Sequence, residues 1–390
     1  MMTTDRTALD RLHEYTGHML KLFTCTLSSV THQTAEAIPT KPPGMSDECA
    51  RDCSTITKHM VRAFLNPAKV SWDMEAYRVQ CAKRNIWGGM QQKEDTLANE
   101  FPSISTDIRN VRSARTVVDR YGRILMWILP GVLPTRLHDM MQRCTAYLED
   151  ELSSVPRGIE SAGSWRFEES LWSYWSESVK TGLMNFSAAW FMNGWMGKNK
   201  GLVSSPLFRK DNGIMWCDEF FECGAILSGV LRIMHPDQYR MGYEVLKHLS
   251  SLQQVERALS RWPSIFNAIT LISNRHCPMH RDNKGSFHLF DILVSTGSYS
   301  NAMFCCTPLG IQIGNTPGTI IGFSGTAFRH GVAQADGARV CHAFYMRGSL
   351  QEFSNVRPCS WMTQEVYRRW IGLRKSKHVG PLHSDPLSME

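Results

Sequence analysis

The feature that most limits the fold is a run of short apolar segments, separated by turn residues, that begins after Trp262-Pro263. Many short strands at regular spacing are typical of an all-β sandwich or barrel. The turn pairs between them include Gly297-Ser298, Pro317-Gly318 and Asp336-Gly337. The sequence therefore predicts strands at 265–272, 287–294, 302–306, 311–313, 319–323, 328–334 and 339–346.

The amino-terminal half has a different character. Residues 5–30 and 218–260 show helical periodicity, as does most of 55–155. Residues 165–195 are rich in aromatic side chains, which favours a helical layer packed on a sheet over a surface that stacks bases. A helical half against a β half predicts an α+β fold. We expect a mainly helical region at 1–210, a β core at 211–355 and a basic tail at 356–390.

Two histidines and one aspartate within the β half stand at a spacing that suits one metal ion. His280 and Asp282 are separated by one residue, and His330 follows 48 residues after Asp282. In an extended chain, residues two apart project to the same face, so both can reach one metal. Two imidazoles and one carboxylate form a facial triad that holds Fe(II) and leaves open positions. The sequence predicts that His280, Asp282 and His330 are catalytic metal ligands.

An arginine follows the second histidine at a useful distance. If Asp336-Gly337 is a two-residue hairpin turn, His330 pairs with Ala343 and Gln334 pairs with Arg339. His330 and Arg339 then share a face, about 13 Å apart along the strand at about 3.3 Å per residue. A guanidinium pairs bidentately with a carboxylate, so Arg339 is a candidate anchor for a dicarboxylate co-substrate. A three-residue turn would break this alignment.

Each of these residues also has a structural explanation. His330 alone fits a hydrogen-bonded core histidine, Asp282 a turn residue, and Arg339 a charged residue that protects a sheet edge. The metal interpretation rests on the three occurring together, in this order and beside strands.

Composition limits the cellular setting. The chain has 390 residues, twelve cysteines and a net charge of +7. Twelve cysteines in so long a chain do not make a disulfide scaffold. Cys49-x3-Cys53 suits a structural metal with Cys81 and a histidine, but buried free thiols are favoured. The first residues are no signal peptide, and the apolar run 124–133 is too short to span a bilayer. A nuclear or cytosolic protein, neither secreted nor membrane-bound, is expected.

Several short stretches of the β half resemble the 2-oxoglutarate/Fe(II) dioxygenases, and among them the TET/JBP group that oxidises methylated DNA bases. The likeness is greatest to the fungal, transposon-associated branch, and it covers about residues 262–350. The matching stretches are His280-Arg281-Asp282, Phe290–Ser295 with Gly297 and Tyr299, Leu309-Gly310, Pro317-Gly318-Thr319, Arg329-His330-Gly331-Val332, and Arg339 with Cys341.

The resemblance implies a double-stranded β-helix (jelly-roll) core with a helical amino-terminal buttress. It implies Fe(II), 2-oxoglutarate and O2 as cofactors, with Arg339 binding the distal carboxylate and Arg275 as a second anionic contact. Relatives often carry Ser or Thr where this chain has Cys341. A thiol is a weak hydrogen-bonding substitute, so Thr319, Ser324 or a water is expected to serve instead.

Methylated DNA is the partner that the resemblance implies. Expected reactions are oxidation of 5-methylcytosine to its hydroxymethyl, formyl and carboxyl forms, or demethylation of N6-methyladenine. A base within a duplex must be flipped out to reach the iron. Candidate contacts to the flipped base are Asn283, Tyr345 and Arg347. Candidate contacts to the DNA backbone are Lys198, Lys200, Arg281 and Lys284, and the tail residues Arg368, Arg369, Arg374, Lys375 and Lys377.

Two other functions stay open on the sequence. One is a 2-oxoglutarate hydroxylase that acts on a protein side chain or a small molecule. The other is a non-catalytic, transposon-associated DNA-binding protein, against which the intact triad and arginine argue. The sequence identifies no protein partner.

Overall fold

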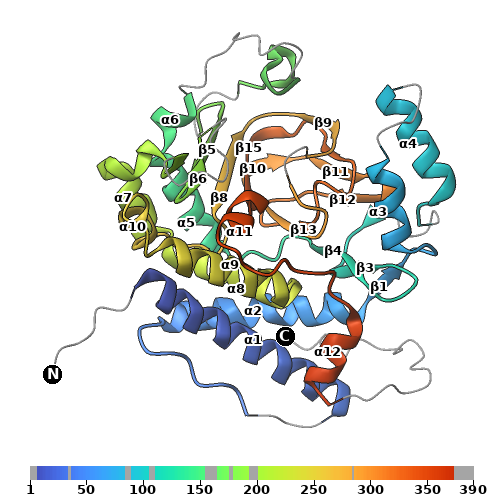
Figure 1. The fold of residues 1–390 in the computed structure, drawn as a ribbon, viewed down its shortest axis with the longest axis horizontal. Coiled ribbons are helices and arrows are strands. Elements are labelled where there is room, and N and C mark those ends of the chain that lie inside the picture. Colours follow the sequence, from blue (N-terminus) through green and yellow to red (C-terminus); the bar gives the residue numbers. More distant parts are fainter. Residues whose placement is uncertain are drawn as a thin grey trace.

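The computed structural model describes residues 7–33, 37–83, 89–104, 110–153, 165–174, 179–192, 201–282 and 285–372. Two β-sheets form the centre, and helices cover one side of the larger sheet (Figure 1). The architecture is α+β, as the sequence predicts. Among the described residues, no helix is both long enough and apolar enough to cross a bilayer.

The larger sheet has eight strands, and all of its neighbouring pairs but one are antiparallel. The first strand pairs in parallel with the second. In spatial order the strands are β1 (Pro67–Lys69), β3 (Arg115–Val118), β4 (Ile124–Leu129), β13 (Ile320–Phe323), β10 (Asp291–Ser300), β15 (Asp336–Tyr345), β8 (Ala268–Ser273) and β5 (Gly182–Ser187).

The smaller sheet has five strands and faces the larger one. In spatial order they are β2 (Asn110–Val111), β12 (Ile311–Gly314), β11 (Met303–Cys306), β14 (His330–Val332) and β9 (Cys277–His280). From β8 to β15 the chain passes repeatedly from one sheet to the other. This crossing pattern is that of a jelly-roll core. A separate hairpin joins β6 (Trp190–Phe191) to β7 (Leu202–Val203).

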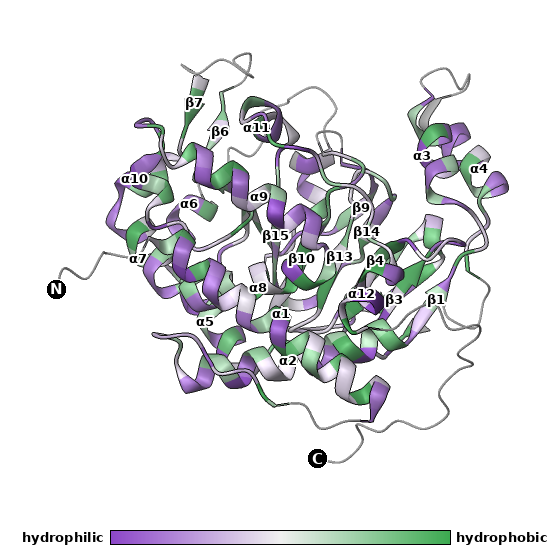
Figure 2. Cartoon of the chain, turned by 60° about the horizontal axis from the view of Figure 1, so that its bottom comes forward, coloured by the Kyte–Doolittle hydropathy of each residue, from purple (hydrophilic) through white to green (hydrophobic). Residues whose placement is uncertain are grey.

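Helices pack on the outer face of the large sheet, and their stripes of hydrophobic and hydrophilic residues are visible in Figure 2. The layer nearest the sheet includes α2 (Asp47–Leu65), α8 (Phe221–Met234) and α9 (Pro236–Leu249), and α1 (Ala8–His32) packs on α2 and α8. The remaining α-helices are α3 (Met74–Ala82), α4 (Gly89–Glu100), α5 (Thr135–Ala146), α6 (Glu149–Ser153), α7 (Asp211–Glu219), α10 (Glu256–Leu259), α11 (Gly348–Phe353) and α12 (Gln364–Trp370). Short 3-10 turns are η2 (Trp165–Phe167), η3 (Glu169–Leu171), η5 (Pro206–Arg209) and η6 (Thr307–Leu309).

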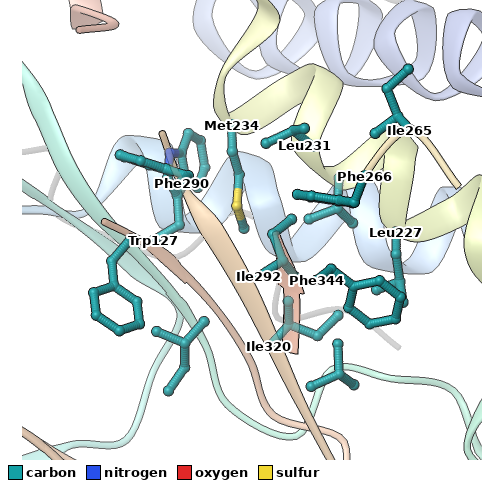
Figure 3. Packing of buried hydrophobic residues seen from close by; sticks show 14 of the residues in the cluster. Trp127, Leu227, Leu231, Met234, Ile265, Phe266, Phe290, Ile292, Ile320 and Phe344 are labelled. Atoms are coloured by element: carbon teal, nitrogen blue, oxygen red, sulfur yellow. The ribbon is translucent and has the colours of Figure 1, made fainter. Parts of the chain in front are cut away.

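The two faces of the large sheet differ in burial, and this difference locates the functional side. On the face toward α8, Ile292 and Phe344 are fully buried and pack with Leu231 and Met234 (Figure 3). Phe344 also lies 5.8 Å from the ring of Phe266. On the opposite face, neighbouring positions are half-buried or exposed, namely Leu183, Asn185, Thr270, Ile272, Asp291, Leu293, Ala343 and Tyr345. The inner face of the sheet is thus the side on which a ligand has access.

The structure corrects the predicted hairpin. Asp336 and Gly337 lie inside β15, not in a turn, and β14 and β15 belong to different sheets. Ala343 pairs with Thr270 and Leu293, whereas His330 pairs with His280. The predicted sharing of one strand face by His330 and Arg339 is therefore wrong.

Two helical predictions in the amino half are also wrong. Within 55–155, residues 115–118 and 124–129 form strands of the large sheet. The described part of 165–195 holds 3-10 turns and the strands β5 and β6 rather than a helical layer. The boundary expected at residue 210 does not divide the sheet. Strands from before this residue pair with strands from after it, since β4 pairs with β13 and β5 with β8.

Candidate metal and co-substrate site

The three predicted metal ligands meet at one end of the smaller sheet. His280 ends β9 and lies opposite His330, the first residue of β14, and their ring centroids are 4.4 Å apart. Asp282 follows two residues later, and one ligand atom from each residue lies within 4.8 Å of the others. This is the only such group of three found among the described residues. The donor set of two imidazoles and one carboxylate fits Fe(II).

Backbone hydrogen bonds set the tautomer of both imidazoles. The Nδ1 atom of His280 lies 2.8 Å from the carbonyl oxygen of Pro278, and that of His330 lies 3.0 Å from the carbonyl oxygen of Phe328. A carbonyl oxygen only accepts, so each Nδ1 carries the proton. Each Nε2 is then an unprotonated lone pair available to a metal. Partners of this kind orient metal-ligating histidines.

Burial keeps both imidazoles neutral. Burial, and after it the neighbouring His330, lower the pKa of His280 to about 4. Burial also lowers the pKa of His330. Neutral imidazole is the form that binds metal, so the pair is ready for an ion at neutral pH.

Gly325 leaves room for the carboxylate ligand. Its carbonyl oxygen accepts a hydrogen bond from the Asp282 backbone nitrogen at 3.0 Å. A Cβ at position 325 would lie 2.4 Å from Oδ2 of Asp282 and 2.9 Å from Oδ2 of Asp291. Burial, reinforced by the Asp282 carboxylate, raises the pKa of Asp291 well above its usual range. Only glycine permits this close packing of the two carboxyl groups.

Arg339 lies deep in the core, 4 % exposed, with hydroxyl groups beside it. Its Nη2 atom donates to Oγ of Ser295 at 3.2 Å. The register of β10 and β15 puts Ser295, Tyr299, Arg339 and Cys341 on one face. Burial raises the pKa of Tyr299 to about 12, so its hydroxyl stays protonated. Ser295 and Tyr299 thus surround the guanidinium with neutral polar groups.

A second buried guanidinium belongs to Arg275. The residue before it, Asn274, donates its backbone N–H to the carbonyl oxygen of Arg339 at 2.8 Å, so the two arginines come from neighbouring backbone segments. Arg275 is 5 % exposed and lies between two indole rings, 5.1 Å from the centroid of Trp165 and 5.3 Å from that of Trp172. Its described hydrogen-bond partners are weak ones, namely the Arg166 carbonyl oxygen at 3.5 Å and the Cys277 sulfur at 3.6 Å.

These two arginines fit a dicarboxylate. Among the described residues, neither guanidinium has a carboxylate partner within salt-bridge distance. The Nε atoms of Arg275 and Arg339 and the hydroxyl of Tyr299 are buried and make no hydrogen bond within the described structure. Buried charges without partners are costly, which indicates that an anion binds here. Arg275 and Arg339, the two arginines predicted from the sequence, therefore stay candidates for binding a dicarboxylate.

The hydroxyls expected to replace the residue at position 341 do not contact Arg339. Thr319 accepts a hydrogen bond from the Gly131 backbone nitrogen, and Ser324 accepts one from Ala327. Cys341 is buried, and burial raises the pKa of its thiol. Ser295 is the hydroxyl beside the arginine, and only the strand register could have revealed it.

An aromatic residue and a cation that the sequence did not single out cover the metal ligands. The Trp165 ring centroid lies 4.8 Å from that of His280. The Nη2 atom of Arg166 lies 3.6 Å from Oδ1 of Asp282. The turn η2 thus closes one side of the site.

The predicted base contacts are only partly within the described structure. Arg347 lies over the Tyr345 ring, 4.7 Å from its centroid, and both are half-buried at the inner face of the large sheet. The hydroxyl of Thr270 lies 3.4 Å from that of Tyr345. Asn283, Lys198, Lys200 and Lys284 lie outside the described residues.

The alternative metal site at Cys49, Cys53 and Cys81 has no counterpart among the described residues. Cys49, Cys53 and Cys81 are free and buried, and no cysteine belongs to a potential metal cluster among the described residues. These three residues are buried free thiols, which is the interpretation that the sequence favours.

Comparison with known proteins assigns the class. Residues 206–348 match the model of the Tet_JBP family, the oxygenase domain of the 2OGFeDO superfamily. The chain therefore contains a dioxygenase domain of the TET/JBP type, which uses Fe(II), 2-oxoglutarate and O2. No curated protein sequence matches the chain.

Two solved structures show a distant likeness. NgTET1 in complex with 5mC DNA aligns with a TM-score of 0.42 and 16% identity, covering 72% of this chain and 93% of that one. JOX2 in complex with 2OG, Fe and JA aligns with a TM-score of 0.26 and 16% identity, covering 78% of this chain and 85% of that one. The assignment rests on the family match and on the geometry of the site.

Proposed function

We propose that this protein is an Fe(II)- and 2-oxoglutarate-dependent dioxygenase that oxidises the methyl group of a methylated DNA base. The observations that carry the proposal are the His280, Asp282 and His330 cluster and two buried guanidiniums, Arg275 and Arg339, for which the described residues supply no carboxylate partner. The match to the TET/JBP family supports a DNA base as the substrate class. The net charge of +7 is compatible with a nucleic-acid partner.

The chain's own residues supply geometry and electrostatics. His280, Asp282 and His330 would hold Fe(II) from one side, and Arg339 with Arg275 would bind the co-substrate carboxylate. When bound, iron and 2-oxoglutarate supply the oxidation, in which O2 is consumed, a C–H bond becomes C–OH, and succinate and CO2 leave. Trp165, whose ring lies against that of His280, would shield this imidazole from water.

The substrate enters, on this proposal, along the inner face of the large sheet. Tyr345 offers an aromatic surface for a flipped base, and Arg347 offers donors to the base edge. Asn283 extends this set, and Lys198 and Lys200 would contact phosphates, together with exposed residues of the tail such as Arg369. We also propose a nuclear location. For the domain organisation, we propose that residues 1–210 pack on the core and contribute to substrate binding, that residues 211–355 form the catalytic core, and that residues 356–390 form a basic tail.

The product depends on whether the methyl group is bound to a carbon or to a nitrogen of the base. Oxidation of 5-methylcytosine gives the hydroxymethyl form, which can react again to the formyl and carboxyl forms. Oxidation of N6-methyladenine gives a hemiaminal, which releases formaldehyde and the free amine. The iron chemistry is common to both, so the shape of the base pocket selects between them.

The test is product analysis on duplexes that carry either 5-methylcytosine or N6-methyladenine. We expect nucleoside mass spectrometry to show oxidised or demethylated base that depends on iron and 2-oxoglutarate. Asp282→Ala should abolish the product. Succinate release without any change in either base would instead favour the alternative, a hydroxylase of a protein or small molecule.

A further inference from the structure

Arg281 lies between two metal ligands in the sequence, yet its side chain points into the protein. Its guanidinium forms a two-point ion pair with Glu94 of α4, with Nε 2.7 Å from Oε1 and Nη2 2.8 Å from Oε2. The Nη2 atom also donates to the Tyr77 hydroxyl of α3 at 2.8 Å. These partners exclude the predicted role of Arg281 as a contact to DNA phosphates.

This ion pair is sheltered from solvent. The side chains of Arg281 and Glu94 are 14% and 12% exposed. Burial disfavours the guanidinium charge, but the Glu94 carboxylate more than offsets this, so the pKa of Arg281 lies above its ordinary value. A bidentate pair in such surroundings holds its partners in one geometry.

The same guanidinium reaches the segment that carries the third ligand. Its Nη1 atom donates to the carbonyl oxygen of Ala327. The next carbonyl oxygen, that of Phe328, accepts the Nδ1 proton of His330. The turn that contains Ala327 also includes Gly325, whose carbonyl oxygen binds the Asp282 backbone nitrogen. The Arg281 side chain therefore links the segment that carries His280 and Asp282 to the segment that carries His330.

Helices α3 and α4 form the other end of this link. The Tyr77 ring packs against Phe328 at 5.7 Å between centroids, and against Trp72 at 5.0 Å. Figure 1 shows α3 and α4 beside the edge of the β core formed by β11 and β12. The amino-terminal helices thus contact the metal-ligand segments through Tyr77, Glu94 and Arg281.

We propose that Arg281 is a positioning residue of the metal centre, and that its ion pair with Glu94 holds the three ligands in metal-binding geometry. This inference rests on the proposed metal site. It assigns a function to α3 and α4, which contribute no ligand.

The experiment measures Co(II) binding to the full chain by calorimetry and by the visible absorption of Co(II), with melting temperature recorded on the metal-free protein. The variants are Arg281→Gln, Glu94→Gln and the double variant. Arg136→Gln is the matched control, because Arg136 forms a comparable ion-pair cluster with Asp52 and Glu222 away from the triad.

The double variant separates positioning from stability. Arg281→Gln alone leaves Glu94 buried without its partner, so the melting temperature should fall. The double variant removes both charges and should regain much of that loss. If Arg281 positions the ligands, the Co(II) dissociation constant of the double variant stays on the order of tenfold or more above that of the wild type, with an altered spectrum. Arg136→Gln should lower the melting temperature without changing Co(II) affinity.

A double variant with wild-type Co(II) affinity and spectrum would overturn the inference. If Arg281→Gln does not fold, Glu94→Gln and the double variant decide the question in the same way. A wild-type protein that binds no Co(II) would instead overturn the metal site itself, and with it the proposed function.

Discussion

His280 and His330 face each other across the β9–β14 pair, with ring centroids 4.4 Å apart and each Nδ1 hydrogen-bonded to a carbonyl oxygen of its own strand segment. Both rings thus present Nε2 toward Asp282, whose Oδ1 lies 3.7 Å from Nε2 of His280. These backbone hydrogen bonds fix the orientation of both rings toward Asp282.

Gly325→Ala should weaken metal binding. A Cβ at this position would lie 2.4 Å from the Asp282 carboxylate and 3.3 Å from Cε1 of His330, so the ligands must move. We expect the Mn(II) dissociation constant to rise on the order of tenfold or more. Gly314→Ala is the control, because a Cβ there meets nothing within 4 Å. Equal Mn(II) affinity in both variants would show that Gly325 does not shape the site.

Ser295→Ala should weaken co-substrate binding. It removes the hydroxyl that accepts from Arg339 at 3.2 Å and leaves a buried guanidinium without that partner. At about 1 kcal/mol for one hydrogen bond, the KM for 2-oxoglutarate should rise roughly fivefold. Succinate release at varied 2-oxoglutarate measures the effect. Ser298→Ala, on the same strand but exposed, should leave the KM unchanged; a similar rise in both variants would contradict the assignment.

Tyr345→Ala should separate co-substrate turnover from base oxidation. The ring lies at the inner face of the large sheet beneath Arg347, and it does not contact the triad. We expect metal binding to persist while oxidised base per succinate falls at least severalfold. Tyr121→Ala, at an exposed position, serves as the control. An unchanged ratio of oxidised base to succinate would argue against Tyr345 as the surface that receives the base.

Acid should destabilise the protein through His235. This residue caps α9 by accepting a hydrogen bond from the Gln238 backbone nitrogen at its Nδ1 atom, 3.2 Å away. Its Nε2 atom donates to the carbonyl oxygen of His288, 3.1 Å away. Because Nδ1 must stay unprotonated to accept, the folded state requires the neutral ring. Burial lowers the pKa of His235 to about 4.

The direction in which stability changes with pH follows from proton binding in the folded and unfolded states. Between about pH 6.5 and 4, the unfolded chain protonates His235 and the folded chain does not, so stability falls as pH falls through this window. The loss is at most about 3 kcal/mol, at about 1.4 kcal/mol per pKa unit. Urea unfolding at pH 7 and pH 5 should show it. His235→Asn, which can still cap the helix, should reduce the difference; an undiminished difference would assign the acid sensitivity to other groups.

Much of the β half follows from sequence periodicity. The seven predicted strands overlap seven of the eight strands from β8 to β15, because short apolar segments here end at turn residues, whereas β9 was not predicted. The triad was also predictable, since its residues come from strand ends in fixed order. The strand β4 was not, because all six of its residues are buried and a continuous apolar run does not distinguish a strand from a helix.

The hairpin prediction failed for a definable reason. Gly337 has a φ of 115° and lies opposite Tyr299, where a Cβ would meet the Ser298 carbonyl oxygen at 2.4 Å. The glycine thus serves a close approach of two strands, whereas the Asp-Gly pair is typical of a turn. Ser295 was missed because its nearness to Arg339 depends on a strand pairing that local sequence does not encode.

The most direct test of the metal and co-substrate site is an anaerobic titration of the metal-free protein with Fe(II), followed by 2-oxoglutarate. We predict one Fe(II) per chain and a visible charge-transfer absorption that requires both additions. Asp282→Ala should lose both signals, and Arg339→Ala should lose the absorption at the same 2-oxoglutarate concentration. A wild-type protein that binds Fe(II) no more tightly than Asp282→Ala does, or that shows no absorption with 2-oxoglutarate, would contradict this account.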